Sequence, residues 1–286
     1  MGFRIVSDSS SNVLSMGEFN YTTVPLKVVA EKEYVDNAAL DLAGMMEDLR
    51  NHKGKSGSSC PNVGEWLEAF GGAEEIFCVT ISRNLSGSYN AAMQAADAYM
   101  EEHPGRKVFV LDSLSAGPEL AMLTEKIFSC EAAGDDFETT KEKVLEYHNH
   151  NHTLFCLESM NNLARNGRVS VAVAKIAGML GIRAVGDVEG GQITPVHKPR
   201  GAKKATQTLV AMMKERGFYD GALLRIAHCF GEAQAKALAD AVMAEFPNTR
   251  LIIEPTTALC SFYAEAGGLM IGFEGGYNEA NNNQDF

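Results

Sequence analysis

The amino-acid sequence predicts an α/β protein of two domains, each a sheet flanked by helices. Short apolar runs rich in β-branched residues alternate with helix-length amphipathic segments along the whole chain. This alternation favours largely parallel sheets that are covered by helices. The chain has 286 residues, of which 45% are hydrophobic, so it is long enough to bury about two cores.

The first half of the chain is expected to form a sheet of about four strands. Its apolar runs have the length and composition of strands, and the segments between them have helical spacing. The candidate strands are residues 3–7, 22–29, 76–81 and 108–111, and the candidate helices are residues 40–50, 65–70, 87–102, 118–133 and 137–147.

The second half shows the same alternation, and the His148-Asn-His150-Asn-His152 segment marks the seam, which gives domains 1–152 and 153–286. We expect these histidines in a solvated connector. A metal site is the alternative, because alternate residues of an extended strand share a face. The candidate strands are residues 154–157, 182–188, 223–228, 251–254 and 269–273, and the candidate helices are residues 203–216 and 232–246.

Composition argues against several classes of protein. The net charge of -12 disfavours nucleic acid as a partner, because a phosphate backbone would be repelled. Six cysteines without C-x-x-C spacing indicate a reducing compartment. The first residues begin a strand pattern rather than a signal peptide, and no run approaches the roughly 18 apolar residues of a membrane span. We therefore predict a cytoplasmic protein with no integral membrane segment.

Hydroxyl-rich segments follow several of the predicted strands. Routine helix capping is one interpretation, because serine, aspartate and asparagine satisfy free N–H groups at helix starts. Their recurrence at one edge of a sheet instead predicts a polar rim that holds an anionic group through O–H and N–H donors. The segments are residues 7–12, 56–61, 81–90 and 112–115.

Six motifs in order along the chain resemble those of the DegV family of bacterial fatty-acid-binding proteins. Each motif is weak by itself, but the resemblance covers nearly the whole chain. The motifs are Val6-Ser-Asp-Ser-Ser10, Ser58-Ser-Cys-Pro-Asn62 followed by Glu65-Trp66, Ile81-Ser-Arg-Asn-Leu-Ser-Gly-Ser-Tyr-Asn90, Asp112-Ser113, Leu163-Ala-Arg-Asn-Gly-Arg-Val-Ser170 and Arg200-Gly-Ala-Lys-Lys-Ala205.

The resemblance implies a DegV-like fold of two α/β domains and a non-catalytic role without a cofactor. It implies a bound long-chain fatty acid, such as palmitate, whose carboxylate lies near the domain junction and whose acyl chain fills an apolar tunnel. Some members of the family are the acyl-carrier subunit of bacterial fatty acid kinase. An ATP-binding fatty acid kinase subunit is therefore the partner that the resemblance implies.

The resemblance also assigns site residues. The family's carboxylate-binding threonine and serine match Ser58 and Ser86, and Ser59 and Gly87 lie beside them in the same motifs. A glycine-arginine pair matches Gly167-Arg168, which adds Arg168 to the predicted ligand site. A salt bridge is the alternative for that arginine.

Two further positions follow from the same comparison. The basic residue associated with engaging the kinase partner matches Arg200, for which a surface salt bridge is the alternative. The family usually carries a histidine in a His-Thr-Gly-Pro-Gly motif before its last strand, where this chain has Tyr263-Ala-Glu-Ala-Gly267. Tyrosine can donate a hydrogen bond but offers no positive charge. Fatty-acid carriage is therefore better supported than partnership with a kinase.

The tunnel and the competing chemistries rest on weaker patterns. A serine acyl hydrolase or thioesterase using Ser86 is the alternative function, although Asn84-Leu-Ser-Gly-Ser88 lacks the G-x-S-x-G pattern and no paired base is evident. Residues 186–191 lack the G-x-G-x-x-G spacing of a nucleotide site. Flexible or bulky side chains expected in the tunnel, with ordinary core packing as the alternative, are Met93, Met122, Met160, Met179 and Phe128.

Overall fold

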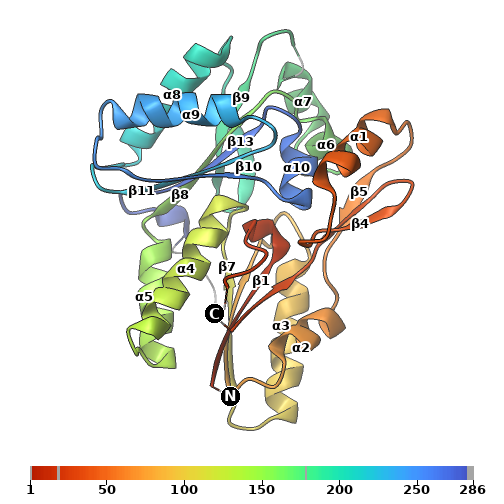
Figure 1. Cartoon of the computed structure of the whole chain (residues 1–286), viewed down its shortest axis with the longest axis vertical. Coiled ribbons are helices and arrows are strands. Elements are labelled where there is room, and N and C mark those ends of the chain that lie inside the picture. The colour runs from red at the N-terminus through yellow and green to blue at the C-terminus, as the bar shows by residue number, and fades with distance from the viewer. Residues whose placement is uncertain (1, 18–19, 178, 282–286) are drawn as a thin grey trace.

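A computed structural model describes residues 2–17, 20–177 and 179–281 of the chain. Its first sheet is parallel and has four strands in the order β2-β1-β6-β7 (Figure 1). Helices α2 and α3 cover one face, and α4 and α5 cover the other. The strands are β1 (Phe3–Asp8), β2 (Tyr21–Val24), β6 (Glu75–Thr80) and β7 (Lys107–Asp112), and the helices are α2 (Val63–Phe70), α3 (Ser88–Glu102), α4 (Pro118–Ala132) and α5 (Phe137–His148).

The apolar run of β6 explains why this strand lies inside the sheet. Ile76 and Cys78 pack under α2 and α3, whereas Phe77 and Val79 pack under α4. A strand that is buried on both faces has a continuous apolar sequence rather than an alternating one. The prediction of a parallel sheet flanked by helices is confirmed for this part of the chain.

The second sheet has six strands in the order β10-β9-β8-β13-β11-β12. Only the pair β11–β12 is parallel, so the prediction of a largely parallel sheet is wrong here. The Gly190-Gly191 turn makes β9 and β10 antiparallel, because a hairpin needs no crossover helix. The other antiparallel pairs join strands that are separated by longer connections, so their direction depends on packing between distant segments. The strands are β8 (Asn151–Leu157), β9 (Ala184–Glu189), β10 (Gln192–His197), β11 (Leu223–His228), β12 (Arg250–Pro255) and β13 (Leu269–Glu274).

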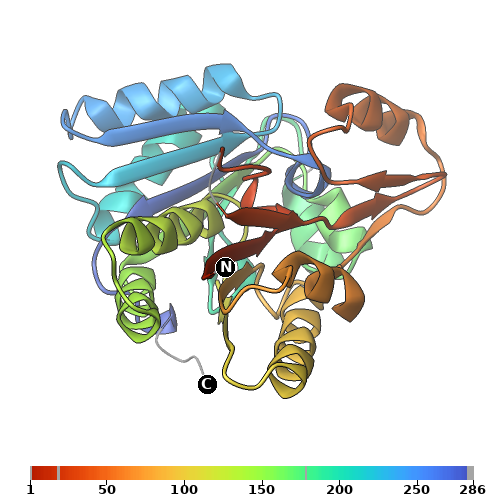
Figure 2. The ribbon, with the colours of Figure 1, turned by 60° about the horizontal axis from the view of Figure 1, so that its bottom comes forward.

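Helices α8 (Ala202–Glu215) and α9 (Glu232–Met243) cover one face of the six-stranded sheet. Helix α4 contacts strands of both large sheets, which explains its nearly all-round burial. Figure 2 shows the two sheets from a second direction. The predicted domain division at residues 152 and 153 falls inside β8 and stays a prediction.

A small antiparallel sheet, in the order β4-β3-β5, lies beside the two large ones. The predicted strand 22–29 is divided between β2 and β3 around Pro25, which has no N–H to donate to a ladder. The remaining elements were too short for the sequence to predict. They are β3 (Lys27–Val29), β4 (Glu33–Val35), β5 (Gly57–Ser59), α6 (Asn161–Arg165), α7 (Val171–Ala177), α10 (Ala258–Ala264), and the 3-10 turns Ser9–Ser11 and Glu279–Asn281. The helix predicted at residues 40–50 is α1 (Leu42–Asn51).

A buried carboxylate joins this small sheet to α10. Asp36 accepts hydrogen bonds from the backbone N–H groups of Ala258 at 2.7 Å and Leu259 at 3.1 Å, the first residues of the helix. Burial raises the pKa of Asp36, although these donors act in the opposite direction. The contact fixes the start of α10 against a segment that precedes it by more than two hundred residues.

Two of the three histidines at the predicted seam are buried, so the expectation of a solvated connector is wrong for them. His148 ends α5 and has no exposed surface, and His152 lies in β8. Within the described residues no group of histidine, cysteine and carboxylate side chains could hold a metal ion. Nor does any helix in the described part of the chain have the length and apolar character to cross a membrane.

Candidate functional site

An apolar cavity lies where the ends of β6 and β7 face the six-stranded sheet. About 720 Å³ of atom-free space lies within its lining, a figure that includes the open solvent at its mouth. Its walls come from the residues after β6 and β7, from β8, β9 and β10, and from α10, and include Leu26, Ile81, Leu157, Leu163, Leu259 and Met270.

Four half-buried polar residues interrupt this apolar lining: Ser58, Ser86, Arg168 and Tyr263. They lie on β5, before α3, after α6 and on α10. All four belong to the predicted carboxylate site, and the fold brings them to one cavity from segments far apart in sequence. That they bind a ligand stays a prediction.

Ser58 and Tyr263 are joined by a hydrogen bond of 2.7 Å between their hydroxyl oxygens. Ser58 is held by the pairing of β5 with β3, where it lies opposite the buried Val28. The ring of Tyr263 packs edge-on against Phe262, with 4.8 Å between the ring centroids. The hydrogen bond therefore joins the small sheet to α10 at the cavity.

Arg168 supplies a positive charge at the same place. Its guanidinium carbon lies 5.6 Å from the centroid of the Tyr263 ring. Its Nε donates to the Leu85 carbonyl at 3.2 Å, and Nη1 donates to the Asn166 carbonyl at 2.6 Å. Among the described residues no carboxylate forms an ion pair with Arg168. The guanidinium is thus positioned by neutral carbonyls, with no compensating carboxylate from the described part of the chain.

Ser86 lies in the turn between β6 and α3. Its Oγ accepts a hydrogen bond from the Ser88 N–H at 3.3 Å, and its own N–H donates to the Ser82 carbonyl at 3.1 Å. In the described part of the chain no histidine lines the cavity or hydrogen-bonds to Ser86. A serine hydrolase needs such a base, so the geometry does not support that alternative.

Two predicted ligand residues lie near the cavity but do not line it. Ser59 is exposed, because it follows Ser58 in β5 and successive side chains of a strand point to opposite faces. Gly87 is exposed at the start of α3, and a Cβ at this position would lie 3.1 Å from Cys60 Sγ. The predicted roles of Ser59 and Gly87 in binding a ligand stay predictions.

Arg200 lies away from the cavity. It is exposed, forms an isolated bridge with Ile182 and precedes α8 by two residues. Its predicted role in binding a partner stays a prediction.

Much of the predicted polar rim is closed by the chain's own carboxylates. Asp8 at the end of β1 accepts hydrogen bonds from the N–H and hydroxyl of Ser10, from the Ile81 N–H at 2.9 Å and from the Ser88 hydroxyl at 2.7 Å. Burial raises the pKa of Asp8 even though these donors oppose the shift. The prediction of four open hydroxyl-rich edges on one sheet is therefore wrong. Asp8 takes donors of segments 7–12 and 81–90, and segment 56–61 lies in the small sheet instead.

The predicted tunnel residues do not line this cavity. Met122 and Met160 have no exposed surface and pack in the core, and Met179 is 58% exposed. Met93 and Phe128 are partly buried at the edges of other clusters. Ordinary core packing, the alternative weighed above, explains most of these positions, and the methionine that lines the cavity is Met270.

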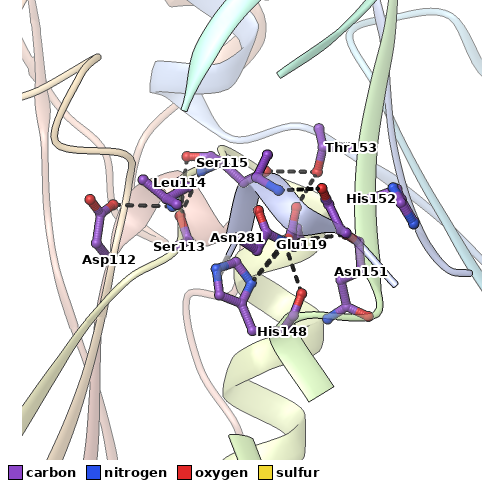
Figure 3. A network of polar contacts seen from close by, with 12 residues as sticks. Asp112, Ser113, Leu114, Ser115, Glu119, His148, Asn151, His152, Thr153 and Asn281 are labelled. Carbon is purple, nitrogen blue, oxygen red and sulfur yellow. Dashed lines mark hydrogen bonds and ion pairs between the residues drawn. The ribbon is translucent and has the colours of Figure 1, made fainter. Parts of the chain in front are cut away.

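Thr153 also lines the cavity, although it lies in an apolar run that carries no sign of such a position. Its hydroxyl donates to Glu119 Oε2 at 2.7 Å and lies 2.7 Å from Ser115 Oγ (Figure 3). The other Glu119 oxygen lies 3.0 Å from His148 Nδ1, and Asn281 Nδ2 donates to the His148 carbonyl at 2.8 Å. This buried network ties α4, α5 and β8 together behind the cavity wall.

Comparison with known proteins identifies the fold. A family model described as "Uncharacterised protein, DegV family" matches residues 2–274. The chain belongs to the DegV family. A DegV domain-containing protein of Streptococcus pneumoniae is 37% identical over 280 residues, which is 96% of this chain and 99% of the relative.

Two solved structures of the DegV family share the fold at a TM-score of 0.93. One is a DegV family protein from Eubacterium eligens loaded with heptadecanoic acid, 37% identical over 96% of this chain and 100% of the neighbour. The other is the Streptococcus pneumoniae Fatty Acid Kinase (Fak) B3 protein loaded with linoleic acid, 38% identical over 96% of this chain and 99% of the neighbour. The predicted family and fold class are confirmed.

Proposed function

We propose that this DegV chain binds a long-chain fatty acid and presents its carboxylate to a separate, ATP-using fatty acid kinase subunit. The observation that carries the proposal is the convergence of Ser58, Ser86, Arg168 and Tyr263 on one otherwise apolar cavity. Similarity to two DegV proteins that hold fatty acids supports it. The chain itself performs no catalysis and uses no cofactor in this proposal, and palmitate is one ligand of the proposed class.

The head-group residues suit a carboxylate. Ser58 and Tyr263 bond to each other at 2.7 Å, so one of the two hydroxyls serves as the acceptor. A carboxylate placed between them would accept from both, and hydrogen bonds to a charged group contribute about 1.5–3 kcal/mol each. Arg168 would balance the negative charge without a competing carboxylate among the described residues.

The apolar walls supply the affinity for the acyl chain. Burying one methylene contributes about 0.8 kcal/mol, so about fifteen methylenes contribute on the order of 10 kcal/mol before ordering costs. The walls hold no competing carboxylate or lysine among the described residues. The hydrocarbon therefore provides binding energy, and the polar residues fix which end of the ligand faces the opening.

The proposed partnership rests on similarity to the Fak B3 protein and on Arg200. Arg200 is exposed and lies outside the cavity, so it is free to contact a partner without disturbing the ligand. Tyr263 at the family's histidine position sets this member apart. We also place the protein in the cytoplasm, which its six free cysteines support.

The first experiment measures the ligand. Chloroform extraction of the purified chain, followed by mass spectrometry, is expected to give about one long-chain fatty acid per protein molecule. Absence of any fatty acid, also after incubation with oleate or palmitate, would overturn the proposal. Hydrolysis of acyl esters that disappears in Ser86→Ala would instead establish the rival hydrolase.

The second experiment tests the partner. The loaded chain is mixed with ATP and the ATP-using subunit of the Streptococcus pneumoniae kinase, and acyl phosphate is trapped as its hydroxamate. Arg200→Glu is expected to raise the half-saturating concentration of the chain about tenfold while its fatty-acid content stays unchanged. Lys143→Glu on α5, an exposed residue paired with Asp135, is the matched control. Product formation that is equal in both variants would remove Arg200 from the partner surface.

A further inference from the structure

The ladder between β8 and β9 ends before the strands do. Its last pair on this side is Leu154 with Asp187, although β8 begins at Asn151 and β9 continues to Glu189. Beyond that pair β8 bonds to β13 and β9 bonds to β10. The two strands therefore separate next to Thr153 and Val188, which leaves an interruption in the six-stranded sheet.

Thr153 and Val188 line two cavities at this interruption. One is the apolar cavity described above, and the other is a polar pocket that opens on the opposite side. His152 and Asp187, which alternate with Thr153 and Val188 along the strands, line only the polar pocket. The two side chains thus form the partition between an apolar and a polar space.

The two halves of this partition are held differently. Thr153 is 6% exposed, and its hydroxyl is fixed by Glu119 and Ser115, each at 2.7 Å (Figure 3). The hydroxyl proton and one of the oxygen's lone pairs are both used in these two hydrogen bonds, which therefore fix the rotamer of Thr153. Val188 is half-buried and has no polar group to hold it in place.

We infer that Thr153 and Val188 form the stop for the methyl end of the bound fatty acid and so set the longest acyl chain that this protein accepts. The inference rests on the proposed function. A chain that reaches the partition meets a threonine that cannot rotate and, behind it, charged groups such as Asp187 and Arg216, which bond to each other. A longer acyl chain would have to displace Val188 and place methylenes in a polar pocket, which gives no hydrophobic gain.

The test compares Val188→Ala with Ile193→Ala. These residues are direct cross-strand partners in β9 and β10, and Ile193 lines only the apolar cavity. Ile193→Ala removes more side-chain volume than Val188→Ala. If cavity volume alone sets the longest accepted acyl chain, Ile193→Ala should therefore lengthen that chain more. A limit set by the partition predicts the larger change for Val188→Ala.

Each variant is stripped of ligand, incubated with an equimolar series of saturated fatty acids of increasing length, and analysed by native mass spectrometry. Val188→Ala removes the steric block, so it is expected to raise retention of acids two carbons beyond the unaltered limit by roughly tenfold relative to shorter acids. Ile193→Ala is expected to change it less than Val188→Ala. An equal or larger shift in Ile193→Ala would overturn the inference.

Thr153→Ser is the second variant, because it removes the methyl group of the partition and keeps both hydrogen bonds. It should move the limit in the same direction as Val188→Ala, and an unchanged limit in both folded variants would overturn the inference. Loss of all fatty-acid binding in the unaltered chain would overturn the proposed function, and the inference with it. An unchanged length limit in chains that still bind overturns the inference alone.

Discussion

Two hydroxyl-rich regions of this DegV protein look alike in sequence and differ in the structure. Around Asp8, the hydroxyls of Ser10 and Ser88 are buried and donate to the chain's own carboxylate. At the cavity, Ser58 and Ser86 are half-buried, and no carboxylate side chain hydrogen-bonds to either among the described residues. The first region is closed by the chain's own carboxyl group, and the second lines the apolar cavity.

Whether a carboxylate of the chain accepts from the hydroxyl donors decides whether such a segment can be a binding site. Donors that cluster at strand ends and helix starts attract an anion in either case. Where the chain places Asp8 among them, the chain's own carboxyl group accepts these hydrogen bonds and the region stabilises the fold. Where the chain places no carboxyl group among the donors, they can bind the carboxylate of a ligand. Substitutions should therefore affect stability in the first region and binding in the second.

The largest expected effect is on stability, from Asp8→Ala. Four donors lose their acceptor in a fully buried site, and each unsatisfied buried donor costs about 1–3 kcal/mol before relaxation. We expect the free energy of unfolding to fall by about 3–5 kcal/mol, because some donors will find water or new partners. Urea unfolding followed by circular dichroism measures this change.

Asp136→Ala is the control for that prediction. Asp136 caps α5 by accepting from the Thr139 N–H at 2.8 Å, and loss of an exposed cap costs about 1 kcal/mol. If Asp8→Ala costs no more than this, Asp8 is not the internal anion of the closed region.

The next largest effect is on binding, from Ser58→Ala combined with Ser86→Ala. Two hydrogen bonds to a charged carboxylate would be lost, and we expect fatty-acid affinity to fall about 100-fold or more. The free energy of unfolding should change by less than about 1 kcal/mol, because neither hydroxyl is fully buried. Displacement of a fluorescent fatty acid measures the affinity.

The matched control replaces two serines outside the site, Ser129→Ala and Ser113→Ala. Ser129 is exposed on α4, and Ser113 is buried after β7, where its hydroxyl donates to the Ser115 carbonyl. Neither lines the cavity, so this pair should leave affinity unchanged. Unchanged affinity in the variant of Ser58 and Ser86 would show that the carboxylate binds elsewhere.

The fold could be predicted where a segment's own pattern decides its structure. The strand β11 and the helix α3 have continuous or periodic apolar residues, and the sequence located both within about a residue. The small sheet could not be predicted as a separate sheet. Its residues 27–29 were predicted as the end of a longer strand, and β4 and β5 have three residues each and depend on contacts with α1 and α10. Strand direction in the second sheet also depends on packing between distant segments.

The candidate site also divides into residues that the sequence could predict and residues that it could not. Ser58, Ser86, Arg168 and Tyr263 were predicted because family motifs mark them, not because local physics brings them together. Thr153 was missed, because a threonine inside an apolar run gives no sign that it will face a cavity. The Asp8 region was misjudged, because a sequence does not show that Asp8 at the end of β1 meets donors that follow β6, more than seventy residues later.

The smallest expected effect is a pH dependence introduced by Tyr263→His. In the described part of the unaltered chain no histidine lines the cavity, so fatty-acid affinity should be nearly constant from about pH 6 to about pH 8. An imidazole at this position titrates near pH 6.5, and its protonated form attracts the carboxylate. The gain is therefore present at low pH and lost as pH rises through that range.

Because the position is half-buried, the gain should be no more than about fivefold between the two ends of the pH range. Tyr263→Phe separates charge from hydrogen bonding, since it removes the hydroxyl bonded to Ser58 and adds no titrating group. It should weaken binding by a similar factor at every pH. If Tyr263→His and Tyr263→Phe show the same pH profile of affinity, the side chain at this position does not face the bound carboxylate. Arg168 would then be the charged contact of the carboxylate at the cavity.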